Sequence, residues 1–188
     1  MSKRSDPAQP GAGLKVWDRP VRLLHWALVL AVACAWWTGG DADSWHEALG
    51  YAAAAVVAWR LAWGFSASRY ARFAQFVRGP SATWAYARSV QAGRALRHLG
   101  HNPLGGWMVL ALLACVASLC LSGFLYTTDW LWGYGWLYWT HVVLGWLLVA
   151  LVAVHLAGVA FTGWQHRDKL VLAMFTGRKR APGPQDIH

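Results

Sequence analysis

The chain has 188 residues, of which 57% are hydrophobic and only 13% are charged. A soluble domain carries about 25% charged residues, so the composition excludes an ordinary soluble domain and indicates an integral membrane protein of one domain. The 15 tryptophans support this class, because tryptophan is enriched where a membrane meets water. The net charge of +9 would suit nucleic acid, but no folded soluble face is predicted to carry it. We therefore expect no nucleic-acid partner.

Residues 1–19 are polar and rich in proline and glycine, and they include no apolar segment of the kind found in a cleavable signal peptide. We expect them to form a mobile tail. The first predicted span, residues 20–38, begins at Pro20, which suits the first turn of a helix, and ends before Gly39. His25 lies near its start. This span is expected to serve as an uncleaved insertion signal.

The second predicted span, residues 45–65, carries His46 at its start and Arg60 14 residues later. Residues 66–100 follow as a long polar segment in which arginines alternate with aromatic residues. This mixture is typical of basic amphipathic segments that lie on a membrane surface.

The third predicted span, residues 103–126, begins after Asn102, a residue that suits the helix N-cap, and contains no histidine. The fourth span, residues 136–163, contains His141 and His155. These two histidines are 14 residues apart, close to four helical turns, so they leave the same helix face. Ionisable residues inside a spanning helix are candidates for function by default.

The predicted fold is therefore all-α and integral to the membrane: residues 20–165 form a four-helix transmembrane bundle, and residues 166–188 form a basic tail. We assign both termini and the 66–100 loop to one side of the membrane. That side, counting Arg60 near the end of the second span, holds all 17 lysine and arginine residues. The opposite loops hold acidic residues and no basic residue. The positive-inside rule makes the basic side cytoplasmic. Both termini are expected in the cytoplasm, and the protein is expected to be a multi-pass protein of the cytoplasmic membrane.

This topology sorts the four membrane histidines by depth. His46 and His141 lie at the outer level, and His25 and His155 lie at the inner level. Two imidazoles at each level match the two axial ligands of a haem b, whose porphyrin supplies the other four nitrogens. Zinc usually takes four protein ligands, and neither level offers them, apart from Glu47 at the outer rim. Two six-coordinate haems about 21 Å apart would carry electrons from one membrane face to the other.

Other interpretations remain open from the residues alone. Membrane histidines can bridge helices by hydrogen bonding, and a haem-free helical scaffold would be colourless. A proton relay would require acidic residues at mid-depth, and the spans have none. Arg60 would either bind a haem propionate at the inner level or extend towards the membrane surface. Cys34, Cys115 and Cys120 lack a metal-binding spacing and are interpreted as small core residues.

Five sequence motifs lie in or beside the predicted spans. They are VWDRPVRLLHW in the first, WHEALGY in the second, GHNPLGGW at the start of the third, HVVLGWLLVALVAVH in the fourth, and HRDKLVLAMFTGRKR after it. With these motifs the chain resembles, over nearly its whole length, the superfamily of bacterial cytochrome b561 and nickel–iron hydrogenase-type dihaem cytochromes b. The resemblance implies a four-helix protein with two haems b that exchanges electrons with the quinone pool. It also implies the axial pairs His25 with His155 and His46 with His141.

The resemblance also implies a quinone site. In the membrane subunit of formate dehydrogenases, an asparagine at the start of the third span lies beside the inner haem and contacts a quinone analogue. Asn102 matches that position, which implies a site for ubiquinone or menaquinone there. Capping the third span is the alternative role of Asn102.

The expected function is electron transfer across the bacterial cytoplasmic membrane between the quinone pool and a periplasmic redox partner, such as a c-type cytochrome or a dehydrogenase subunit. A stand-alone superoxide:quinone oxidoreductase, which small relatives resemble, is the alternative, and whether the protein is itself an enzyme stays open. Superoxide is an anion and would favour an electropositive outer face. The outer loops are acidic, which favours a basic protein partner instead.

Overall fold

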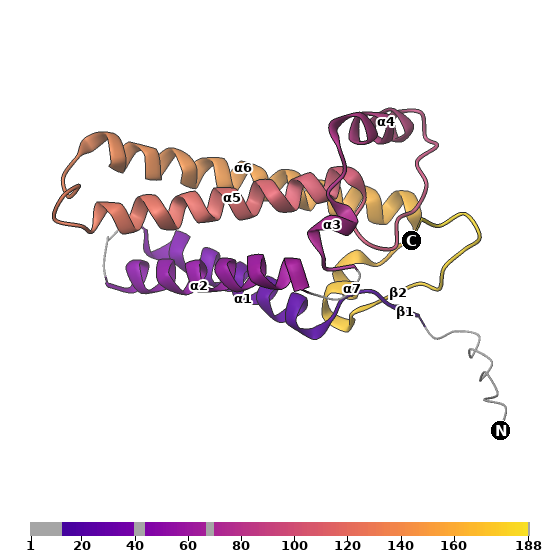
Figure 1. The fold of residues 1–188 in the computed structure, drawn as a ribbon, viewed down its shortest axis with the longest axis horizontal. Helices are drawn as coiled ribbons and strands as arrows, with labels where there is room; N and C mark the ends of the chain where they lie inside the picture. The colour runs from indigo at the N-terminus through magenta and orange to yellow at the C-terminus, as the bar shows by residue number, and fades with distance from the viewer. Residues whose placement is uncertain (1–12, 40–43, 67–69, 188) are drawn as a thin grey trace, which may run out of the picture.

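Four long helices form a bundle in the computed structural model, which describes residues 13–39, 44–66 and 70–187 (Figure 1). The helices are α1 (Arg19–Thr38), α2 (Ser44–Ser66), α5 (Pro103–Tyr126) and α6 (Gly135–His166). Each of the four is long and apolar enough to cross a membrane. The predicted all-α, four-span integral membrane fold is thereby confirmed.

Side-chain caps mark where two of the spans begin. Asp18 Oδ1 accepts a hydrogen bond from the backbone N–H of Val21 at 2.9 Å, which caps α1. Asn102 Oδ1 accepts one from the N–H of Gly105 at 2.7 Å, which caps α5. A proline follows each cap in the first turn, where its missing N–H costs nothing. These caps fix the residues at which the two helices begin.

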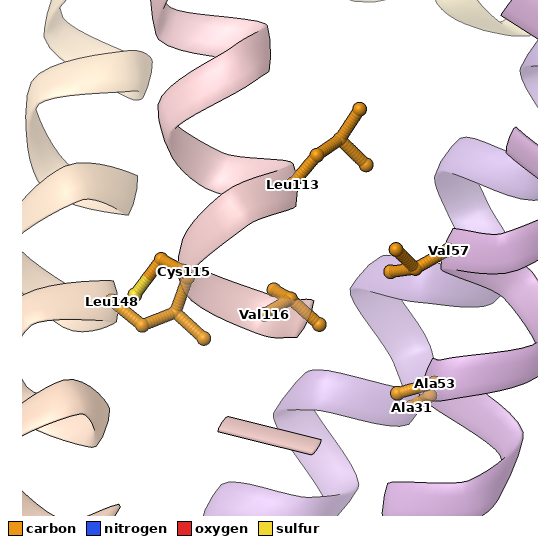
Figure 2. Packing of buried hydrophobic residues seen from close by; sticks show 7 residues of the cluster. All are labelled: Ala31, Ala53, Val57, Leu113, Cys115, Val116 and Leu148. Atoms are coloured by element: carbon orange, nitrogen blue, oxygen red, sulfur yellow. The ribbon is translucent and has the colours of Figure 1, made fainter. Parts of the chain in front are cut away.

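The bundle core is made of small and branched apolar residues. Helix α1 packs on α2, α5 packs on α6, and α2 packs on α5. Figure 2 shows the central cluster, which draws on all four helices and consists of Ala31, Ala53, Val57, Leu113, Cys115, Val116 and Leu148. Small residues at such positions let helix backbones approach closely in lipid. Helices α1 and α6 meet at fewer points, one being the edge-to-face contact of Trp36 with Trp146 at 5.1 Å between ring centroids.

A polar cap closes the end of the bundle at which α1 begins and α6 ends. We call this the basic end; residues 13–18, 70–101 and 167–187 form it. Its elements are β1 (Leu14–Lys15), α3 (Phe73–Phe76), α4 (Pro80–Gln91), α7 (Leu170–Thr176) and β2 (Arg178–Lys179). Strands β1 and β2 pair antiparallel, so both described ends of the chain lie at this end of the bundle (Figure 1).

The N-terminal segment differs from the expected mobile tail over residues 1–19. Residues 13–18 are held in place, because Val16 and Trp17 are 3% and 6% exposed and pack against Ala173 of α7. The backbone N–H groups of Val16 and Trp17 both donate to the carbonyl of Gly177. Residues 1–12 lie outside the described part of the chain.

One buried arginine ties the basic end together. Arg97 donates from Nε to Asp168 at 2.7 Å and also forms an ion pair with Asp186. Burial alone would lower the pKa of Arg97, but the two carboxylates raise it. The backbone of the same segment pairs with the C-terminal residues, since the N–H of Ile187 donates to the Arg97 carbonyl and the N–H of Leu99 donates to the Ile187 carbonyl. The C-terminal segment is therefore part of the folded structure.

Candidate functional site

His46 and His141 face each other at the end of the bundle opposite the basic end. His46 lies in the first turn of α2, and His141 lies two turns into α6. Both helices begin at this end, which brings the two side chains to one depth. Their ring centroids are 5.9 Å apart, and both residues are half-buried.

Acceptor oxygens determine which nitrogen of each outer imidazole carries the proton. His46 Nδ1 lies 2.9 Å from the carbonyl oxygen of Ala35, which can only accept. His141 Nδ1 lies 3.0 Å from Ser122 Oγ, and that hydroxyl donates to the Leu119 carbonyl, so its oxygen accepts from the histidine. Both Nδ1 atoms therefore carry hydrogen, and both lone pairs are on Nε2. A hydrogen bond at the nitrogen that does not bind the metal orients the imidazole of a metal-binding histidine.

Two glycines give these imidazoles room. A Cβ atom at Gly123 would lie 3.3 Å from Cε1 of His141, and one at Gly39 would lie 3.4 Å from Cε1 of His46. The first distance is tighter than ordinary van der Waals contact. The absence of a side chain at Gly123 therefore allows the His141 ring its observed position.

The inner pair is His25 of α1 and His155 of α6. The two imidazoles are close enough to interact electrostatically. His25 Nδ1 is buried and has no hydrogen-bond partner among the described residues. The His25 and Trp26 rings are in edge-to-face contact, with their centroids 5.0 Å apart. Both pairs thus include a residue of α6, which runs the length of the bundle.

Arg60 lies buried towards the inner pair. It is 8% exposed, its Nη2 donates to the Ala71 carbonyl at 3.2 Å, and its guanidinium lies 4.9 Å from the centroid of the Phe73 ring. Its Nη1 is buried without a partner in the described part of the chain. A buried guanidinium nitrogen without an acceptor suits an anionic group supplied by a cofactor.

His101, for which the sequence predicts no role, also lies at the level of the inner histidine pair. Its ring sits between Trp17 and Phe76, at centroid distances of 4.7 and 4.6 Å. It interacts electrostatically with both inner histidines. Burial, followed by the charges of Lys179 and Arg60, lowers the pKa of His101 to about 3, so it is neutral at pH 7. Its Nδ1 has no hydrogen-bond partner among the residues that the structure describes.

Asn102 is used as a helix cap, through the Oδ1 bond to Gly105 described above. A cavity of about 10 Å³ lies next to it, with His98, His101 and Pro103 in its lining. A volume of about 10–15 Å³ holds one water molecule, so this cavity does not hold a quinone ring. The proposed contact of Asn102 with quinone stays a prediction.

Two further residues orient the site and carry no sequence signal. Ser122 is one of several small residues in α5, and only the fold shows that it faces His141. Ala35 acts through its backbone carbonyl, which every residue has. The one sequence hint for Ser122 is its depth in the bundle. Ser122 lies near the C-terminal end of α5 and His141 lies near the N-terminal end of α6, and these two ends are at the same end of the bundle.

The histidine pairs have too few protein ligands for a metal bound by side chains alone. No group of three or more His, Cys, Asp or Glu residues that could hold a metal occurs within residues 13–39, 44–66 and 70–187. A metal–imidazole bond of about 2 Å on each side of one iron places the ring centroids about 6 Å apart, which agrees with the 5.9 Å between His46 and His141. The donor set therefore fits a porphyrin that supplies the remaining four ligands.

Four helices long enough to span a membrane, with His46 facing His141 near one end, are typical of membrane-embedded b-type cytochromes. Residues 16–177 match the family model described as prokaryotic cytochrome b561, and the chain belongs to that family. The resemblance found from the sequence motifs is thereby confirmed. The protein is accordingly a multi-pass membrane protein of electron transport that binds haem b. No curated protein and no solved structure matches the chain.

Proposed function

We propose that the protein binds two haems b and transfers electrons across the bacterial cytoplasmic membrane. The electrons pass between the quinone pool and a periplasmic redox partner, either a c-type cytochrome or a dehydrogenase subunit. The observation that carries this proposal is the arrangement of the outer pair. Both His46 and His141 are held as Nδ1–H tautomers by protein oxygens, which leaves the Nε2 lone pairs to act as metal ligands.

The chain's residues divide into two ligand sets. His46 and His141 would hold the outer haem, and His25 and His155 would hold the inner haem. Haem b supplies a reversible one-electron couple at each site. Nη1 of Arg60, which has no hydrogen-bond partner among the described residues, would bind a propionate of the inner haem. Two histidines at each site would leave no open position for a small molecule, which favours electron transfer over chemistry on a bound substrate.

The charge distribution supports the orientation. The basic end carries the arginines and lysines of residues 13–18, 70–101 and 167–187, so the positive-inside rule places it in the cytoplasm. Glu47 and Asp129 lie at the opposite end, which is then periplasmic. An acidic rim above the outer haem suits a basic redox partner, because opposite charges speed encounter.

The quinone site rests on the family resemblance of Asn102 and on its surroundings. Asn102 lies next to His101, which interacts electrostatically with both inner histidines. Oδ1 of Asn102 caps α5, and the Asn102 side chain also forms a hydrogen bond with Tyr86. A ubiquinone or menaquinone carbonyl would accept from the Asn102 amide NH₂ group, which Tyr86 also contacts.

Haem counting on the purified protein tests this proposal. The wild type should hold two haems b per chain, with low-spin b-type bands in the reduced-minus-oxidised spectrum. His46→Ala and His25→Ala should each hold one, with different spectra, because they disable different sites. His98→Ala is the matched control, since this histidine lies outside the four helices, and it should keep two. One haem in the wild type, or two in either single variant, would refute the two-haem assignment.

A further inference from the structure

A groove at the basic end separates α4 from the last turns of α6. Helix α4 packs on α5 and stands apart from α6 in Figure 1. The groove has a volume of about 500 Å³, and its walls include Val90, Gln91, Phe161, Trp164, Gln165 and Arg167. Neither histidine pair takes part in it, so the groove is separate from the haem sites.

The groove is lined by both apolar and polar residues. Phe161 and Trp164 of α6 are 46% and 78% exposed and are apolar members of the lining. Gln91, Gln165 and Arg167 also line the groove, and their side chains carry carboxamide and guanidinium hydrogen-bond donors. An amphipathic ligand matches this mixed lining.

The length of α6 places the groove at the membrane surface. Helix α6 has 32 residues, and at 1.5 Å per residue it is about 48 Å long. A hydrocarbon core of about 30 Å leaves about six residues at each end in the headgroup layer. The last residues of α6, from Phe161 onwards, therefore lie where phospholipid headgroups begin.

The charge of Arg167 is not neutralised by the protein. Its side chain forms no hydrogen bond or ion pair with any residue in the described part of the chain. The carboxylate next to it in sequence, Asp168, is fully engaged, because Oδ2 accepts from Arg97 Nε at 2.7 Å and Oδ1 accepts from Arg97 Nη2 at 3.0 Å. Asp186 is paired with Arg97 as well. The groove lining therefore includes a cation that no described carboxylate neutralises.

We propose that this groove binds an anionic phospholipid of the adjoining leaflet. Its phosphate contacts the guanidinium of Arg167, the carboxamides of Gln91 and Gln165 donate to the headgroup, and one acyl chain lies along Phe161 and Trp164. Basic pockets between spanning helices bind anionic headgroups in this way. A neutral quinone would fit the apolar members of the lining but would leave the Arg167 charge unmatched.

Native mass spectrometry of the detergent-purified full-length protein tests the site. Phosphatidylglycerol and phosphatidylcholine are titrated separately, and the bound population is measured for each. Arg167→Asn is the diagnostic variant: Arg167 has a left-handed backbone with φ 50°, and asparagine tolerates that conformation while removing the charge. Lys169→Asn is the matched control, since Lys169 is exposed and lies outside the groove lining.

The wild type should bind one phosphatidylglycerol more tightly than phosphatidylcholine. Arg167→Asn should weaken the phosphatidylglycerol site by about fivefold, the factor expected for one basic residue at a membrane surface, and Arg167→Lys should retain most of the affinity. Lys169→Asn should bind as the wild type does, and inorganic phosphate should not displace the lipid. Equal binding of both lipids, equal binding to wild type and Arg167→Asn, or displacement by ubiquinone would overturn the proposal. The haem content of all variants should stay unchanged, which separates this site from the proposed electron-transfer function.

Discussion

At the scale of single residues, acceptor oxygens decide what the outer histidines can do. An imidazole binds a metal through the nitrogen that lacks a proton, and the hydrogen bond at the other nitrogen sets which one that is. Here the acceptors are a backbone carbonyl from α1 and a serine hydroxyl from α5, so three helices besides α6 contribute to one site. The site is thus built by the bundle, and no single helix carries it.

Removing the hydroxyl of Ser122 tests this arrangement. Ser122→Ala should leave the outer haem in place but weaken its binding by about 10–100-fold, the usual effect of removing a hydrogen-bond partner of a metal-binding histidine. Haem dissociation rates, measured by transfer to an excess of a haem-scavenging protein, report the change. Ser66→Ala is the control, because Ser66 also bonds a carbonyl of its own helix but contacts no histidine. Equal dissociation rates for both variants would contradict the orienting role.

A methyl group at Gly123 should disturb the outer haem directly. The added Cβ would lie 3.3 Å from Cε1 of His141, so the ring must shift by a few tenths of an ångström. We expect Gly123→Ala to weaken binding of the outer haem and to leave the inner one unchanged, measured as haem dissociation rates. Gly158→Ala in α6 is the matched control, because a Cβ there meets nothing within 4 Å. That variant should keep both haems and gain about 1 kcal/mol of helix stability.

At the scale of elements, buried charged side chains hold the segments of the basic end together. Lys179 of β2 is 8% exposed, donates from Nζ to the Gly100 carbonyl at 3.4 Å, and lies 5.6 Å from the Trp17 ring centroid. Together with Arg97, it joins the N-terminal segment, the loop before α5 and the C-terminal segment. Buried charges of this kind cost stability when unpaired and specify which segments meet.

The charge of Lys179 predicts a pH dependence above neutrality. Burial, only partly offset by Asp168, lowers the pKa of Lys179 from 10.5 to about 8. Between those values the folded protein has released a proton that the unfolded chain still binds, so the free energy of unfolding should rise with pH from about 8 to 10.5. Thermal unfolding in detergent at several pH values measures this slope.

A neutral residue at position 179 should remove that slope. Lys179→Met keeps the apolar stem over Trp17 and removes the titrating group, so its stability should change less between pH 8 and 10.5 than that of the wild type. Lys169→Met, at an exposed position, should behave as the wild type does. Equal slopes for the wild type and Lys179→Met would show that Lys179 does not titrate with a lowered pKa in the folded protein.

At the scale of the whole molecule, the sequence predicts the elements that depend on local composition. The spans follow from hydropathy and from Asp18, Asn102 and the prolines that start the helices, which act within a few residues. The common depth of His46 and His141 follows from counting spans and turns. These predictions needed no knowledge of which helix packs on which.

The basic end could not be predicted in this way. Residues 13–18 were expected to be mobile, but they pair with residues 177–179, more than 150 positions away in the chain. The Arg97–Asp168–Asp186 cluster likewise joins segments that no local pattern connects. Ser122 and the groove beside Arg167 depend on which helix faces which. Such contacts arise from tertiary packing, which periodicity and composition do not encode.

The proposed arrangement of two irons makes the molecule a relay, and this has a consequence for variants that lose one haem. Helix α6 spaces His141 and His155 by about 21 Å, so each haem covers only part of the path across the bilayer. His25→Ala and His46→Ala should each retain one haem, yet both should lose transmembrane electron transfer. A variant with half the haem should not keep half the rate, because the two sites act in series.

Proteoliposomes with an impermeant reductant outside and trapped ferricyanide inside measure this directly. The wild type should bleach the trapped ferricyanide, whereas both single-haem variants should fall to the leak rate of protein-free liposomes. His98→Ala, which leaves the membrane histidines intact, should match the wild type. If either single-haem variant kept half of the wild-type rate or more, the remaining haem would suffice for transfer. The two histidine pairs would then act independently, and α6 would not join them in one path.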